Sequence, residues 1–240
     1  MNDKIRIVLV NPSHPGNIGA AARAMKNMGL RSLYLVDPQK FPHPEAIYRA
    51  SRADGIVKNA VVVQTLDEAI KNCVYVFGAS TRDRVMSSPV LNVREMSEKI
   101  INECADDEVA IVFGRERTGL NDAEIRRCQY QVKIPAVEDY SSLNLAAAVQ
   151  VVTYELRMAM LTQDVVLAKD NKGESVDLAT AGELEGLYQH LEEVMAEIGF
   201  LNTNKPRMMM SRFRKIFNHA ELDKEDVNLL RGMLKRILAF

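Results

Sequence analysis

The stretch IRIVLVNPSHPGNIGAAARAMKNMGL, residues 5–30, decides the fold class of this chain. Residues 5–10 are nearly all apolar rather than alternating, which is typical of a strand buried in a parallel sheet. A loop with two prolines and two glycines follows, and a helical pattern over residues 18–28 comes after it. A strand followed by a loop and a helix is the unit from which α/β layer folds are built.

The same order repeats along the first 160 residues. The further predicted strands are 33–36, 61–63, 74–77, 111–113 and 131–134, and the further predicted helices are 44–54, 93–104 and 141–161. Ser141 or Ser142 would cap the last of these helices. The order predicts an α/β domain with a parallel sheet and helices on both faces.

A polar segment, residues 163–180, separates this domain from three further helical patterns over 183–198, 207–218 and 224–238. Its polar composition around Asn171, Lys172 and Gly173 is typical of a linker. We therefore expect a first domain over 1–162, a linker over 163–180 and a small all-helical C-terminal extension over 181–240.

The composition is that of an ordinary globular protein, with 47% apolar and 26% charged residues among 240. No apolar stretch approaches the ~20 residues needed to cross a bilayer, and the N-terminus lacks the order of a signal peptide. Cys73, Cys104 and Cys128 are too few and too widely spaced for a disulfide framework or a metal site. We expect a cytoplasmic protein without a metal. The net charge of −1 does not by itself indicate a nucleic-acid partner.

Three unusual segments follow predicted strands, at the sheet edge where α/β proteins bind ligands. The first, NPSHPGNIGAAAR at 11–23, opens onto a helix. Its glycines would let a ligand approach the backbone, its helix N-terminus favours anions, and Arg23 would fork onto a phosphate. The alternative is a loop with a solvated arginine. The segment lacks G-x-G-x-x-G, which argues against a nucleotide- or NAD-binding enzyme.

The second and third segments are FGRERTGL at 113–120 and IPAVEDYSSLNL at 134–145. Gly114 and Gly119 suit unusual backbone angles or close contact with a ligand. Glu116 stands between two arginines, which would hold it ionised. A surface charge cluster is the alternative for the second segment. Simple helix capping explains one serine of the third, but not Ser141, Ser142 and Asn144 together.

In this order, the segments resemble the three motifs of the SPOUT (trefoil-knot) RNA ribose 2'-O-methyltransferases. The match reads N-P-x-x-x-G-N-I-G-x-x-x-R, then F-G-x-E-x-x-G-L, then S-S-L-N-L-A-A-A-V, and it covers residue 5 to about residue 161. The opening stretch, VFGRERTGL and the C-terminal helices most resemble the bacterial tRNA (cytidine/uridine-2'-O)-methyltransferases that act at anticodon-loop nucleotide 32.

The resemblance implies a C-terminal deep trefoil knot formed around 113–120 and 134–145, a homodimer whose partner completes the site, and S-adenosylmethionine as the cofactor. It places the cofactor at Ala79, Ser80, Thr81, Gly114, Arg115, Gly119, Ile134, Ser141, Ser142, Leu143 and Asn144. The implied substrate is tRNA, with no DNA and no membrane as partner.

The resemblance also places Arg23 near the RNA phosphate and the 2'-oxygen. We expect Arg23 with the adjacent phosphate to assist deprotonation, since arginine alone is a poor base. Asn17 would orient it, Glu116 would anchor the site, and Ser142 and Asn144 would hydrogen-bond the cofactor or the acceptor.

Basic residues indicate where RNA would bind. Besides Arg23, the candidates are Arg82 and Arg84 after a predicted strand, and Arg207, Arg212 and Arg214 in the acid-free stretch 198–220. The aromatic residues of that stretch have helical spacing, so core packing is the alternative for them. A ribosomal-RNA ribose methyltransferase and a non-catalytic RNA-binding knot protein remain alternative functions.

Overall fold

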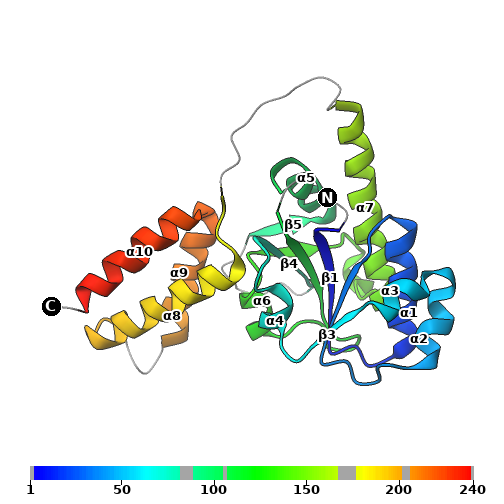
Figure 1. Ribbon diagram of the computed structural model, residues 1–240, viewed down its shortest axis with the longest axis horizontal. Coiled ribbons are helices and arrows are strands. Elements are labelled where there is room, and N and C mark those ends of the chain that lie inside the picture. Colours follow the sequence, from blue (N-terminus) through cyan, green and yellow to red (C-terminus); the bar gives the residue numbers. More distant parts are fainter. Residues whose placement is uncertain (1–2, 82–88, 105–106, 167–176, 202–205, 239–240) are drawn as a thin grey trace.

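The computed structural model describes residues 3–81, 89–104, 107–166, 177–201 and 206–238 (Figure 1). Its centre is a sheet of seven parallel strands in the order β3-β2-β1-β6-β4-β7-β5. The strands are β1 (Ile5–Val10), β2 (Ser32–Val36), β3 (Val61–Val63), β4 (Tyr75–Ala79), β5 (Val90–Asn92), β6 (Val109–Phe113) and β7 (Tyr130–Lys133).

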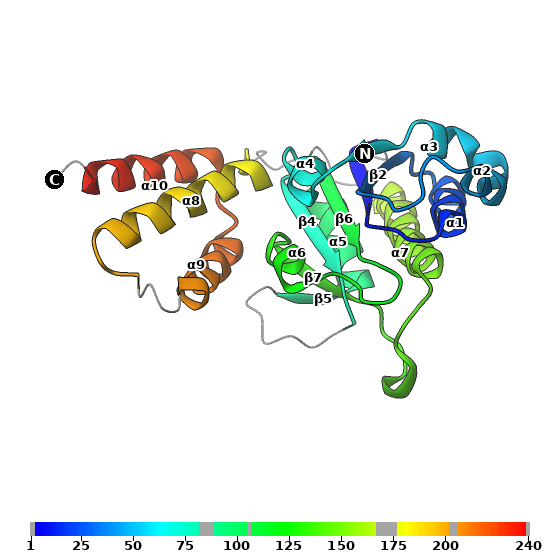
Figure 2. The ribbon, with the colours of Figure 1, turned by 90° about the horizontal axis from the view of Figure 1, so that it is seen from below.

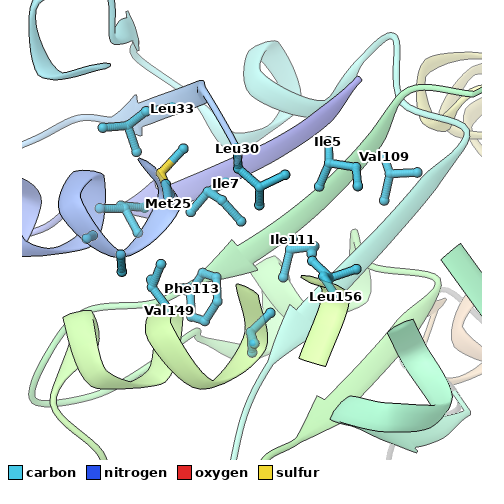
Figure 3. Close-up of a cluster of buried hydrophobic side chains, with 14 of the residues drawn as sticks. Ile5, Ile7, Met25, Leu30, Leu33, Val109, Ile111, Phe113, Val149 and Leu156 are labelled. Carbon is cyan, nitrogen blue, oxygen red and sulfur yellow. The ribbon is translucent and has the colours of Figure 1, made fainter. Parts of the chain in front are cut away.

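Helices cover both faces of this sheet. The helices of the first domain are α1 (Pro15–Asn27), α2 (Pro44–Ala50), α3 (Asp54–Lys58), α4 (Leu66–Ile70), α5 (Val93–Glu103), α6 (Asp122–Arg126) and α7 (Leu145–Val166). Ile5, Ile7 and Leu9 of β1 share a core with α1, α5 and α7 (Figure 3), whereas Val8 and Val10 pack with α4 and α6. Because successive side chains alternate between faces, a strand covered on both sides must be apolar throughout.

The chain crosses the carboxyl ends of the strands before α7. Strand β7 lies between β4 and β5, yet α7 packs against α1 and α5. The connecting residues 134–144 therefore pass the ends of β4 and β6, and this crossing is where the predicted knot would form. The predicted fold class, a parallel sheet with helices on both faces and a helical C-terminal domain, is confirmed.

Three C-terminal helices, α8 (Ala181–Glu197), α9 (Pro206–Ala220) and α10 (Lys224–Ile237), form a separate group with its own apolar core (Figure 2). They dock on the amino ends of β4 and β7. The amide of Ala181 donates to the carbonyl of Cys73 at 2.7 Å, and the Tyr130 hydroxyl donates to Glu221 at 2.6 Å. This is the sheet edge opposite to the one that the segment 134–144 crosses.

Several predicted boundaries are wrong for local reasons. The predicted helix 44–54 is broken at Ser51, whose φ of 53° lies in the left-handed region. Helix α7 begins at Leu145 rather than residue 141 and continues to Val166, into the predicted linker. Strand β5 and helices α3, α4 and α6 were not predicted from the sequence. Each has only three to five residues, which is too few to show a periodicity. No helix in the described part of the chain is long and apolar enough to cross a membrane.

Candidate active site

A cavity of about 300 Å³ opens at the carboxyl ends of β4, β6 and β7. Its walls come from the second and third motif regions and from the ends of β4 and β7. The lining residues are Ala79, Ser80, Thr81, Phe113, Gly114, Arg115, Glu116, Arg117, Thr118, Gly119, Leu120, Val132, Ile134, Ser142, Leu143, Leu145 and Ala148. The cavity lies at the lower end of the size range for small-molecule sites, ~300–1,000 Å³, and mixes apolar walls with a few polar groups.

The residues predicted to hold the cofactor line this cavity, with the exceptions of Ser141 and Asn144. The cavity is also lined by residues that were not among the predicted cofactor contacts, namely Phe113, Arg117, Thr118, Leu120, Val132, Leu145 and Ala148. Most of these residues are sequence neighbours of predicted ones. All except Val132 lie inside the second and third motifs, so the motifs themselves were the signal that could have found them.

The second motif forms a tight loop at the mouth of the cavity. The amide of Gly119 donates to the Arg115 carbonyl at 2.8 Å, and the Arg115 amide donates back to the Gly119 carbonyl at 3.3 Å. Gly119 has a φ of 65°, which favours glycine. A Cβ on Gly114 would lie 2.1 Å from the backbone of Gly119 and Leu120, so no side chain fits there. Both glycines are thus required by the loop that lines the cavity.

Glu116 ties this loop to the first motif. Its carboxylate accepts hydrogen bonds from the Ser13 amide at 3.1 Å, the Ser13 hydroxyl at 2.9 Å, the His14 amide at 3.2 Å and the Asn17 side chain at 3.0 Å. Burial raises the pKa of this carboxyl, but the donors from Asn17, Ser13 and His14 outweigh burial and lower it. The prediction that flanking arginines keep Glu116 ionised is therefore wrong. Arg115 instead forms a bidentate pair with Glu124 at 2.9 and 3.0 Å.

Asn17 also connects the first motif to the third motif by a hydrogen bond with Asn144. Glu116 can only accept, so the Asn17 amide must present its nitrogen to it and its oxygen to Asn144. Asn144 accordingly donates to Asn17 Oδ1 at 3.1 Å, and its own oxygen accepts from the Ala146 amide at 2.9 Å. The polarity of the whole chain is set by a carboxylate at one end and a helix N-terminus at the other.

Two sequence interpretations of these segments need correction. Asn144, rather than Ser141 or Ser142, caps α7, because it accepts the first amides of that helix. Gly19 does not face a ligand. A Cβ there would lie 2.1 Å from the Ala46 carbonyl oxygen, so Gly19 lets α1 pack closely on α2.

The predicted catalytic residues divide into two groups. Asn17, Glu116 and Asn144 form the network just described, and Ser142 lines the cavity beside it. Arg23 lies two turns further along α1, is exposed, and does not line the cavity of its own chain. Within one chain the structure therefore does not bring Arg23 to the cavity.

The predicted RNA contacts lie in different surroundings. Arg82 and Arg84 fall outside the described residues, as does the side chain of Arg207. Arg212 is exposed, whereas Arg214 pairs with Glu185 at 2.8 Å and lies over the Tyr188 ring. These helices dock at the sheet edge opposite to the cavity. Among the residues described, no group of three or more His, Cys, Asp or Glu side chains is placed to hold a metal ion.

Comparisons with known proteins agree with this architecture. Residues 4–154 match the model of the SpoU rRNA Methylase family, and residues 182–239 match that of the tRNA methyltransferase TrmJ, C-terminal domain. The chain is 51% identical over 240 residues to a tRNA (cytidine/uridine/adenosine-2'-O-)-methyltransferase TrmJ from Pseudomonas aeruginosa, covering 98% of this chain and 93% of the relative. It is 45% identical over 240 residues to a tRNA (cytidine/uridine-2'-O-)-methyltransferase TrmJ from Sodalis glossinidius, covering 99% and 92%.

Solved structures show the same fold. A TrmJ structure from Z. mobilis ZM4 has a TM-score of 0.83 at 31% identity and covers 97% of this chain and 98% of that one. A probable methylase family protein from Haemophilus influenzae Rd KW20 has a TM-score of 0.68 at 40% identity, covering 100% and 97%. Two of the three motif regions thus line one cavity, and Asn17 of the first is hydrogen-bonded to both, in a chain whose two parts match two methyltransferase models. The chain belongs to the SpoU methylase family, with a C-terminal domain of the kind found in the TrmJ tRNA methyltransferases.

Proposed function

We propose that this protein transfers a methyl group from S-adenosylmethionine to the ribose 2'-hydroxyl of a cytidine or uridine at nucleotide 32 of the tRNA anticodon loop. The observation that carries the proposal is the hydrogen-bonded chain from Glu116 through Asn17 to Asn144. It joins the three motifs at the rim of one cavity. A merely structural loop would not need all three motifs to meet at a hollow surface.

The cavity suits S-adenosylmethionine. Its walls combine apolar side chains with hydroxyl and charged groups, and the closed loop that lines it leaves no room for a Cβ at Gly114. We propose that Ala79, Ser80, Thr81, Gly114, Arg115, Gly119, Ile134, Ser142 and Leu143 hold it directly. Ser141 and Asn144 would act through the backbone of the same segment. When bound, this cofactor supplies an activated methyl group and its own leaving group.

Arg23 would act on the RNA side of the reaction. A ribose hydroxyl is a weak nucleophile, so its proton must be removed and the developing charge stabilised. The exposed Arg23 guanidinium can fork onto the adjacent phosphate and hold the oxyanion. The phosphate would take part in proton removal, because arginine stays protonated. Asn17 would fix the start of α1, and so the place of Arg23.

We propose a homodimer because one chain does not bring Arg23 to its own cavity. Helix α7 also leaves an apolar stripe exposed, with Val151, Tyr154, Met158 and Leu161 at helical spacing. Beside it lies a groove of about 390 Å³ against α5. We propose that a second copy covers this stripe and that the partner's α1 completes the cavity.

tRNA is favoured over ribosomal RNA by the C-terminal helices, which match the TrmJ C-terminal model. We propose that the first domain, over 1–162, carries the chemistry and that the extension over 181–240 contributes to tRNA binding across the linker 163–180. Such a protein would work in the cytoplasm, where tRNA is processed.

The test uses purified full-length protein, labelled S-adenosylmethionine and unmodified bulk tRNA, followed by digestion and mapping of the label. We expect the label in a 2'-O-methylated cytidine or uridine of the anticodon loop. Label on a base, or in ribosomal RNA alone, would contradict the proposal. Binding of RNA without any transfer would favour the non-catalytic alternative.

A further inference from the structure

Four basic residues meet where α1 packs on α2. They are Arg23 and Lys26 of α1, Arg49 of α2 and Arg52 of the turn that follows, and we call them the α1–α2 basic seam. All four are exposed. Helix packing fixes their proximity, because a Cβ on Gly19 would lie 2.9 Å from Arg49 Cβ, and the Lys26 ammonium donates to the Arg52 carbonyl.

Along α1, Arg23 lies between Gly19, which packs against Arg49, and Lys26, which donates to the Arg52 carbonyl. Positions 19, 23 and 26 fall on one face of α1, because residues three and four apart are neighbours on a helix. The seam therefore continues from the proposed catalytic arginine along the line where α1 packs on α2, two helices that run side by side in Figures 1 and 2.

The charge of this seam is not neutralised by the protein. Among the described residues, Arg23, Arg49 and Arg52 have no carboxylate within ion-pair distance, and Lys26 bonds a carbonyl. Neither acid of α2 and α3 forms an ion pair with the seam. Glu45 lies 3.9 Å from His14, and Asp54 pairs with Lys58 at 2.6 Å. Such a concentration of unpaired positive charge attracts a polyanion.

The helix that carries Arg49 of the seam also carries an exposed aromatic ring. Tyr48 precedes Arg49 on α2, and 81% of its surface is exposed. The ring is therefore not held by the core and adds little to folding. Exposed tyrosines next to cationic side chains are the usual platform on which unpaired bases stack.

We propose that the α1–α2 basic seam and Tyr48 bind the single-stranded RNA next to the nucleotide that is methylated. The cations contact backbone phosphates, and the Tyr48 ring stacks on one unpaired base. The inference rests on the proposed function, since Arg23 links the seam to the reaction. It assigns to α1 and α2 the RNA contacts nearest to the chemistry.

The test compares two double variants with the same change of charge. Arg49→Gln with Arg52→Gln removes two cations of the seam and keeps part of each aliphatic stem. Arg31→Gln with Lys71→Gln is the matched control, because both residues are exposed and precede β2 and β4, at the opposite sheet edge. For each double variant we would measure the affinity for unmodified tRNA and its salt dependence, and the rate of methyl transfer. The thermal midpoint and the cofactor affinity serve as controls for folding.

We expect the seam variant to bind tRNA about tenfold more weakly at about 0.15 M salt. The slope of log K against log salt should fall by about 1.4, at ~0.7 for each lost single-strand phosphate contact. KM for tRNA should rise, with the thermal midpoint and cofactor affinity at wild-type values. A seam variant that behaves like its control would overturn the phosphate contacts.

Tyr48 is tested separately with Tyr48→Ala and Tyr48→Phe. Stacking requires the ring and not the hydroxyl, so Tyr48→Ala should weaken tRNA binding about tenfold while Tyr48→Phe binds as wild type. Equal, wild-type affinity of both variants would overturn the stacking contact. Failure of these variants to differ while the wild type methylates tRNA refutes only this inference. Absence of transfer by the wild type refutes the proposed function.

Discussion

The side-chain amide of Asn17 donates a hydrogen bond to the Glu116 carboxylate at 3.0 Å, although the two residues are 99 positions apart. The same Asn17 side chain accepts from Asn144, 127 positions further along the chain. One asparagine thus joins the loop after β1, the loop after β6 and the start of α7. The relative placement of these three segments therefore depends on the Asn17 side chain.

Replacing Asn17 tests the polarity of this connection. Asn17→Asp keeps the shape of the side chain but sets a second carboxylate against Glu116, whereas Asn17→Ala only removes two hydrogen bonds. We expect the aspartate variant to lose about 5 °C more in thermal midpoint than the alanine variant. An aspartate variant at least as stable as the alanine variant would show that Glu116 does not accept from this position.

Glu116 should make the stability of the folded protein depend on pH in a definite direction. Its folded-state pKa is lowered, so its contribution to stability is present above the ordinary value of 4.5 and is lost as pH falls through the folded value. Glu116→Gln should therefore lower the thermal midpoint at neutral pH, by about 5 °C. The gap from wild type should narrow on acidification to about pH 3, as followed by calorimetry. A constant gap would mean that the charge of Glu116 contributes nothing.

Gly114 should tolerate no side chain. Alanine there would place a Cβ 2.1 Å from the backbone of Gly119 and Leu120, which forces the loop open. We expect cofactor binding, measured by calorimetric titration, to weaken by at least about tenfold. Gly55→Ala is the control, since its Cβ would meet nothing within 4 Å and alanine favours the helix. Wild-type cofactor affinity in Gly114→Ala would remove the loop from the proposed site.

Replacing Arg214 and replacing Arg212, two residues apart on α9, should affect different properties: stability in the first case and tRNA binding in the second. Arg214 pairs with Glu185 and lies over Tyr188, so Arg214→Gln should lower the thermal midpoint by a few degrees, about one to two kcal/mol. Arg212 is exposed, and Arg212→Gln should weaken tRNA binding without affecting stability. The reverse assignment of the two effects would contradict the structure of this helix.

The sequence was enough to predict six of the seven strands because a buried parallel strand is apolar on both faces, as in Ile5–Val10 and Val109–Phe113, whereas the three-residue β5 was not predicted. It also singled out Gly114 and Gly119, whose conformational needs depend on their own loop. The role of Gly19 could not be predicted, since it depends on where α2 lies. The donors to Glu116 come from residues about 100 positions away, so the two neighbouring arginines were a misleading guide to its ionisation.

Arg23 is the residue on which the proposed chemistry depends. Arg23→Ala should reduce the rate of methyl transfer to tRNA by about a hundredfold or more, with cofactor affinity unchanged, because it loses the group that stabilises the oxyanion. Arg23→Lys keeps the charge but not the forked geometry, so it should recover only part of the rate. Single-turnover kinetics measure both. Full transfer by Arg23→Ala would exclude this role.

The most direct test of the account removes one oxygen atom, that of the 2'-hydroxyl, from the substrate. Two otherwise identical tRNAs are prepared, one with ribose and one with 2'-deoxyribose at nucleotide 32, and each is incubated with the protein and labelled S-adenosylmethionine. We predict transfer to the first tRNA and none to the second, with similar binding of both. Equal transfer to both tRNAs would show that the methyl group goes elsewhere and would contradict the central claim.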